Sequence, residues 1–251
     1  MTNYLQTKLA ASRQLLRLHP HWLLFAISLL CWANILLESQ DRHHHHHHHM
    51  TMSALSDAMS QLLGWLTMVY AMMLPMLSGS LRWLLQSQPR YLRWRGIIAF
   101  LLGYSCLWLA IGLAIYGLGL WLNGLPQHSL QQAQIGALAF FSAGLISRTS
   151  YRQSAVYACG SGMPLRIQGW GAWFDTFQFG AIKGGRCAAS CLHLMVALIL
   201  AGHTLPLMLL VTALLFYERR LLPRRTRMIE IACYSLALLY TLLWLQPTLF
   251  Q

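Results

Sequence analysis

Charged residues are scarce in this sequence. Asp, Glu, Lys and Arg make up 10% of the 251 residues, and only 6 residues are acidic, whereas about 25% of a typical soluble domain is charged. Hydrophobic residues reach 57%, and the mean hydropathy is +0.47. This composition excludes a soluble enzyme, a disordered protein and a disulfide scaffold. It predicts an all-α, polytopic helical membrane protein.

Signatures of several other classes are also missing. The net charge of +12 is accompanied by no nucleic-acid-binding motif, so we expect the lipid bilayer and no nucleic acid as a partner. The six cysteines lie mostly in or beside apolar runs, which does not indicate a secreted disulfide framework. No internal repeat is apparent, so a transporter built from inverted repeats is not supported.

Seven apolar segments are long enough, or nearly so, to cross a bilayer as helices. Helices are expected because backbone groups inside lipid need partners within the chain. The fifth and sixth segments are joined by a tight turn at Gly202, which leaves a re-entrant hairpin as an alternative to two full spans. The predicted segments are 22–37, 62–85, 97–122, 130–146, 179–201, 205–222 and 229–245.

The basic residues predict the orientation of these spans. With the N-terminus inside, 17 of the 18 Lys and Arg residues lie in inner segments, and only Arg42 lies outside. We therefore expect a multi-pass protein of the bacterial inner membrane, with the C-terminus outside. Residues 1–21 form a cytoplasmic segment, 22–59 an uncleaved signal-anchor helix with an outer loop, and 60–251 a six-helix membrane domain with basic inner loops.

The outer loop is rich in histidine and is followed by Met50 and Met52. Neutral imidazoles bind Zn, Cu and Ni, and a run of them captures such ions without a fixed geometry. An engineered affinity tag or a neutral tract is the alternative, although seven residues and an internal position are unusual for a tag. The run comprises His43, His44, His45, His46, His47, His48 and His49.

Two further sets of soft ligands have helical spacing. Met68, Met72 and Met76 recur every four residues, which places them on one helix face. Thioethers suit Cu(I), although methionine also packs well in lipid-facing or core positions. Cys187 and Cys191 are one turn apart, and the next turn carries Met195.

The cysteine pair is the more specific of the two signals. Two thiolates one turn apart can hold a soft metal or oxidise to a disulfide. The small residues around them, such as Gly184 and Gly185, allow close helix approach, so the pair is expected to face the bundle. The alternative is that they pack as small hydrophobic residues. By depth, Met72 or Met76 is expected to complete the site.

Two residues near the inner boundary are also candidate ligands. Glu218 is an acidic residue beside a membrane span, which makes it a functional candidate. The alternative is a salt bridge to Arg219, Arg220 or Lys183. Cys159 lies in an inner segment that is rich in glycine and aromatic residues, and we interpret that segment as a loop.

These motifs resemble a bacterial family of predicted metal-binding integral membrane proteins, the domain of unknown function 2182. The resemblance covers roughly residues 60–245. It rests on the methionine-rich stretch 65–75, the glycine-flanked Cys187/Cys191 segment ending in Met195, and Glu218 followed by a basic residue. The family's inner-loop cysteine pair is reduced here to Cys159. The resemblance implies metal binding in the membrane.

The sequence therefore favours a metal-binding role over an enzymatic one. We expect capture of a soft transition metal, copper or alternatively zinc, at the outer loop, and its retention or transfer at the Met/Cys site. A membrane or periplasmic protein partner is a further expectation. One alternative is a membrane thiol oxidoreductase that uses Cys187 and Cys191, although its usual C-x-x-C spacing is missing. Another is a structural subunit of a larger membrane complex.

Overall fold

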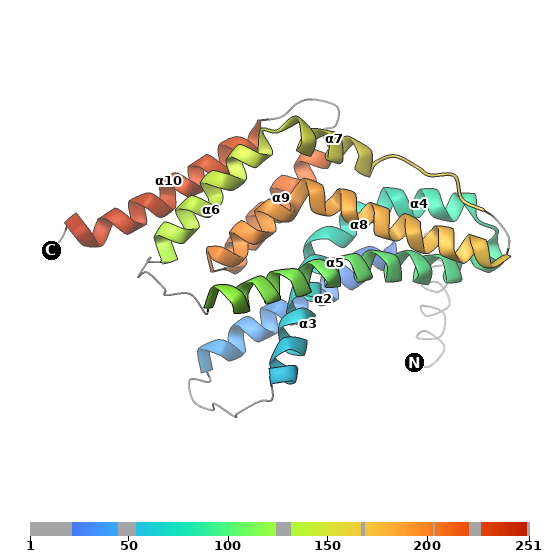
Figure 1. The fold of residues 1–251 in the computed structure, drawn as a ribbon, viewed down its shortest axis with the longest axis horizontal. Coiled ribbons are helices and arrows are strands. Elements are labelled where there is room, and N and C mark those ends of the chain that lie inside the picture. Colours follow the sequence, from blue (N-terminus) through green and yellow to red (C-terminus); the bar gives the residue numbers. More distant parts are fainter. Residues whose placement is uncertain are drawn as a thin grey trace, which may run out of the picture. The chain divides into compact units, whose positions relative to one another are not determined.

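The computed structural model describes residues 22–44, 54–123, 132–166, 169–202, 204–220 and 227–249, and every regular element in these ranges is helical. The chain divides into two compact units, each described here by itself. The first comprises the described residues up to Gly103 together with Gly162–Phe179, and the second comprises Tyr104–Ser161 and the described residues from Gly180 onward. Helices α5 (Arg93–Asn123) and α8 (Gly169–Leu200) contribute to both units (Figure 1).

The first unit is built around a cluster of aromatic rings. Trp83 and Phe100 both pack against Phe179, with ring centroids 5.3 and 5.6 Å apart. Helix α2 lies against α3 and the short helix η1. The elements of this unit, besides the first parts of α5 and α8, are α2 (Trp22–His44), α3 (Ala54–Met73), η1 (Leu74–Leu77), α4 (Ser78–Ser87) and η2 (Arg90–Leu92).

Pro75 explains why the second apolar segment is not one continuous α-helix. Proline has no N–H to donate to the carbonyl four residues earlier, which here belongs to Ala71. That oxygen accepts instead from Ser28 Oγ at 2.7 Å and from Trp32 Nε1 at 3.0 Å, both on α2. The chain continues as the 3-10 helix η1 and then as α4. Helix α2 thus satisfies a backbone group that lipid cannot satisfy.

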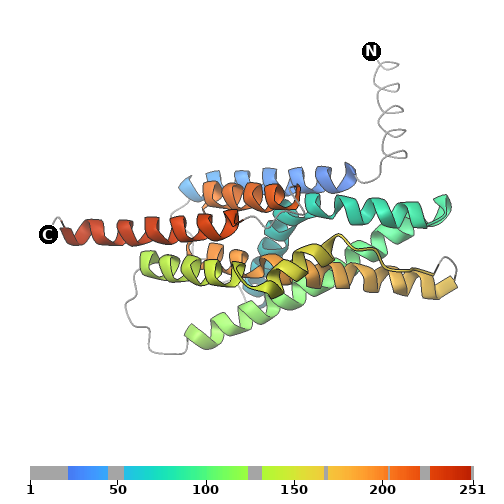
Figure 2. The same cartoon turned by 90° about the horizontal axis from the view of Figure 1, so that it is seen from above.

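The second unit contains the remaining parts of α5 and α8 together with α6 (Gln132–Ser147), α7 (Ser150–Cys159), α9 (Leu205–Arg220) and α10 (Met228–Leu249). Helices α6 and α10 lie side by side in both views (Figures 1 and 2). Gly136 and Gly144 of α6 make this approach possible, because a Cβ at either position would lie 2.7 Å from the ring of Tyr240 or Tyr234.

Over the residues that the structure describes, all seven predicted apolar segments are mainly helical, which confirms the all-α fold class. Within the described residues, five stretches are long and apolar enough to cross a membrane: Trp22–Ser39, Ser56–Ser87, Arg93–Trp121, Gly171–Leu200 and Met228–Leu245. Helices α6 and α9 have 16 residues each. At 1.5 Å per residue such a helix covers about 24 Å, less than the ~30 Å hydrocarbon core. Five spans are therefore supported by length and composition, and the count of seven stays a prediction.

The stretch 147–178, which lies between the predicted spans 130–146 and 179–201 and is interpreted from its sequence as an inner loop, contains two helical parts. Helix α7 occupies Ser150–Cys159, and its N-cap residue Thr149 accepts from the backbone N–H of Arg152. Helix α8 begins at Gly169, ten residues before the apolar segment predicted from 179. Hydropathy missed both features because these helical turns carry many polar and small residues.

Candidate metal centre

Cys187 and Cys191 lie on α8 within the second unit, and both are 0% exposed. Their Sγ atoms are 3.9 Å apart, and Cys191 Sγ donates to the carbonyl oxygen of Cys187 at 2.9 Å. A Cβ at Gly184 would lie 2.9 Å from Cδ2 of Leu107 on α5. The prediction that small residues admit a neighbouring helix and turn the cysteines into the protein is confirmed.

The spacing of the two sulfurs suits a shared metal ion. None of the six cysteines forms a disulfide, so both sulfurs of this pair can act as metal ligands. With metal–sulfur distances of about 2.3 Å, sulfurs 3.9 Å apart subtend an angle of about 115° at the ion. That angle lies near those of tetrahedral and trigonal sites, and it leaves room for one or two more ligands.

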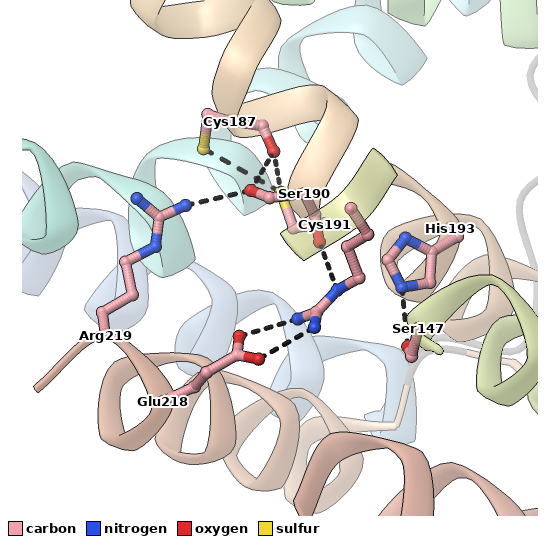
Figure 3. A network of polar contacts seen from close by, with 8 residues as sticks. Ser147, Cys187, Ser190, Cys191, His193, Glu218 and Arg219 are labelled. Atoms are coloured by element: carbon pink, nitrogen blue, oxygen red, sulfur yellow. Dashed lines mark hydrogen bonds and ion pairs between the residues drawn. The ribbon is translucent and has the colours of Figure 1, made fainter. Parts of the chain in front are cut away.

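Polar groups surround the pair, and Figure 3 shows those of Ser190 and Arg219. The hydroxyl of Tyr104, on α5, donates to Cys187 Sγ at 3.7 Å. Ser190 Oγ donates to the carbonyl of Cys187 at 2.8 Å and accepts from Nη2 of Arg219 at 3.0 Å. Arg219 comes from α9, so three helices contribute to the surroundings of the two thiols.

Glu218 forms an ion pair with Arg152 of α7, and not with Lys183 or Arg219, two of the three basic residues proposed from the sequence; the side chain of the third, Arg220, lies outside the described part of the structure. Nη1 and Nη2 of Arg152 donate to the two carboxylate oxygens at 2.8 and 2.7 Å, and the side chains are 4% and 11% exposed. Arg152 Nε also donates to the carbonyl of Ser190 at 3.1 Å. Neighbouring helical residues point in different directions, so Arg219 faces Ser190 while Glu218 faces Arg152.

Cys159 is buried at the C-terminal end of α7. Burial raises the pKa of its thiol, and the nearby guanidinium of Arg219 partly opposes this rise. The carbonyl of Cys159 accepts from Lys183 Nζ at 2.6 Å, and that of Ala158 accepts from Arg186 Nη1 at 2.9 Å. Cations at a helix C-terminus are favourable, and these two fasten α7 to α8.

The other predicted ligands are distributed over the chain. Met68 and Met72 are buried on α3, whereas Met76 follows Pro75 in η1 and is half-buried, so the methionine face does not continue as one α-helical stripe. These methionines belong to the first unit. In the second unit, Met195 is fully buried on α8, one turn beyond Cys191.

The predicted histidine ligands, His43–His49, are separate from His193, which lies on α8. His43 and His44 fall in the last turn of α2, while His45–His49 lie outside the described residues. His193 is packed inside the second unit, where its Nε2 lies 3.0 Å from Ser147 Oγ. Among the residues that the structure describes, no three His, Cys, Asp or Glu side chains converge as metal ligands. Within that part of the chain, a third ligand for the cysteine pair comes from another residue type, such as methionine, or requires a rearrangement.

Sequence reasoning missed three residues that surround the pair. Tyr104 lies within an apolar run and Arg152 lies in the segment interpreted as a loop, so neither stood out. Ser190 was noted only as a small residue. The one available signal was polarity inside α8, where a serine stands between two cysteines.

Comparison with known protein families gives an independent assignment. Residues 62–243 match the profile of PpoB2, a family described as a copper chaperone. The chain belongs to the PpoB2 copper chaperone family. No curated protein and no solved structure matches it. The resemblance to a metal-binding family is thus confirmed in its general form. The matched range contains Cys187, Cys191 and Glu218 together with Met68, Met72 and Met76.

Proposed function

We propose that this protein is a membrane copper chaperone that captures the ion at its outer His/Met-rich loop and holds it at Cys187 and Cys191 before passing it on. Membership of a copper chaperone family supports the copper-related role. The observation that carries the proposed site is the pair of buried thiols, not joined by a disulfide and with sulfurs 3.9 Å apart, on a helix apolar enough to cross a membrane.

The surroundings of the pair favour a soft, monovalent ion. Thiolates and thioethers are soft ligands that suit Cu(I), and Met195 offers a thioether one turn further along α8. Metal binding replaces the thiol protons, because a thiolate is the ligand form. Both sulfurs are completely buried, so the thiol of another protein cannot reach them for thiol–disulfide exchange. This favours metal retention over a redox role.

The remaining candidates fit a route to and from this pair. His43–His49 collect the ion outside, and the methionines Met68, Met72 and Met76 provide further soft ligands in the first unit. Cys159, at the end of α7, provides a third thiol on the inner side for release. Glu218 is a ligand only after its ion pair with Arg152 opens, because both carboxylate oxygens already accept from that residue. The proposed topology has seven spans, with the N-terminus inside and the C-terminus outside.

Elemental analysis of detergent-purified protein tests the proposal. The histidine run is first replaced by serine, so that it cannot contribute metal. After loading with Cu(I), this protein retains one copper per chain, and Cys187→Ser/Cys191→Ser retains none. Cys31→Ser/Cys233→Ser is the matched control and keeps the full equivalent, because these cysteines lie on α2 and α10. A full equivalent of copper in the Cys187→Ser/Cys191→Ser variant would exclude the site.

A further inference from the structure

Positive charge dominates the surroundings of the cysteine pair. The Arg219 guanidinium donates to Ser190 Oγ at 3.0 Å, and Ser190 lies between the paired cysteines in sequence. It is also close enough to Cys159, Cys187 and Cys191 to interact with the negative charge of their thiolate forms. Figure 3 shows the guanidinium turned towards Cys187 and Ser190.

Glu218, the neighbour of Arg219 in sequence, does not neutralise the positive charge of Arg219. Both carboxylate oxygens of Glu218 are bonded to Arg152. Within the described part of the chain, the ion pairs are Arg152–Glu218 and Arg166–Asp175, so no described carboxylate pairs with Arg219. Lys183 and Arg186 add positive charge from α8 itself, where they bond to carbonyls at the end of α7.

The charge of the metal complex depends on the ion. When two thiols bind Cu(I) and release two protons, the resulting bis-thiolate complex carries a charge of −1. The same two thiolates with Zn(II) form a neutral complex. The guanidinium of Arg219 neutralises the first complex and stays uncompensated beside the second. An uncompensated charge is unfavourable in the low-dielectric interior of a membrane protein.

We infer that Arg219 is a specificity-determining residue that makes the Cys187/Cys191 pair prefer monovalent soft ions, Cu(I) and Ag(I), over divalent Zn(II). This inference rests on the proposed function, since it assumes that the pair binds metal. Arg219 acts through its charge and not as a ligand, so a charged replacement retains the preference and a neutral one loses it. Ser190 holds the guanidinium in place.

Competition between Cu(I) and Zn(II) tests this inference on the full chain with the histidine run replaced by serine. Arg219→Gln lowers the ratio of Cu(I) affinity to Zn(II) affinity by about a hundredfold, the effect of one charge a few Å from another in partly polar surroundings. Arg219→Lys keeps the ratio within about threefold of the parent. Arg148→Gln, which removes an exposed arginine, leaves it unchanged and controls for net charge.

The affinity ratio separates a charge effect from a general loss of structure, because unfolding weakens the binding of both ions. If Arg219→Gln does not fold, Ser190→Ala provides the second test, since it releases the guanidinium and lowers the ratio in the same direction by about tenfold. An unchanged ratio in a folded variant overturns the inference while leaving the copper site intact. Cu(I) binding that is equal with and without Cys187 and Cys191 refutes the proposed function instead.

Discussion

Replacing Glu218 by glutamine leaves the guanidinium of Arg152 buried without its counter-charge. The two side chains are 4% and 11% exposed, and two N–H···O contacts of 2.8 and 2.7 Å join them. Little solvent screens this pair. Opposite charges about 4 Å apart at an effective dielectric constant of about 20 attract by roughly 4 kcal/mol. Removing one partner of a buried pair destabilises a protein by about 3–5 kcal/mol. We expect Glu218→Gln to fall at the lower end of that range, because its amide oxygen still accepts one hydrogen bond.

Reversible unfolding in detergent measures this loss as a change in the free energy of unfolding. The matched control is Asp175→Asn, which breaks the Arg166–Asp175 ion pair. This pair has the same contact distance of 2.7 Å, but its Arg166 side chain is 68% exposed. Exposed ion pairs contribute little to stability, so we expect Asp175→Asn to have nearly the same free energy of unfolding as the parent protein. The variant Arg152→Met/Glu218→Leu removes both charges and is less destabilised than Glu218→Gln. If Glu218→Gln and Asp175→Asn lose equally little stability, the proposed stabilising role of the buried Arg152–Glu218 pair is refuted.

Three further outcomes follow from the structure and the proposed topology. Ser28→Ala/Trp32→Phe deprives the Ala71 carbonyl of both donors and lowers the free energy of unfolding by about 1–3 kcal/mol; equal stability in denaturant titration contradicts this role of α2. Replacing His43–His49 by serine lowers copper loading only when copper is limiting. The higher copper loading of the parent protein disappears as the pH falls through about 6.5, since protons compete with copper for imidazole. Loading that does not depend on pH would identify the histidine run as a neutral spacer. Reporter fusions at Gln251 and Gln88 report the outer and inner side respectively, and an inside signal at Gln251 excludes the seven-span topology.

Hydropathy predicted where the long helices lie because a membrane span has to be apolar along most of its length. Hydropathy does not detect α7, because its residues Ser150–Cys159 include few strongly apolar side chains. It also set the start of α8 too late, since the stretch before Phe179 mixes glycine, aspartate and aromatic residues. The end of α3 at Met73 could have been predicted, because Pro75 interrupts the backbone hydrogen bonds of any α-helix.

The cysteine pair was accessible from the sequence because both thiols lie on one helix, where spacing alone determines that they are neighbours. Its surroundings were not accessible, since Tyr104, Arg152 and Arg219 come from three other helices. Which basic residue pairs with Glu218 depends on how α7 and α9 pack, and adjacent sequence positions suggested the wrong partners. Local periodicity identifies ligands, whereas the charges around them depend on tertiary structure.

X-ray absorption at the copper edge most directly tests the claim that Cys187 and Cys191 hold the ion. The sample is the full chain loaded with one equivalent of Cu(I), with His43–His49 replaced by serine so that imidazole from this run cannot contribute. The account predicts at least two sulfur neighbours at about 2.3 Å, and their disappearance in Cys187→Ser/Cys191→Ser. A coordination shell made only of nitrogen or oxygen, or a sulfur shell unchanged by the double substitution, would contradict it.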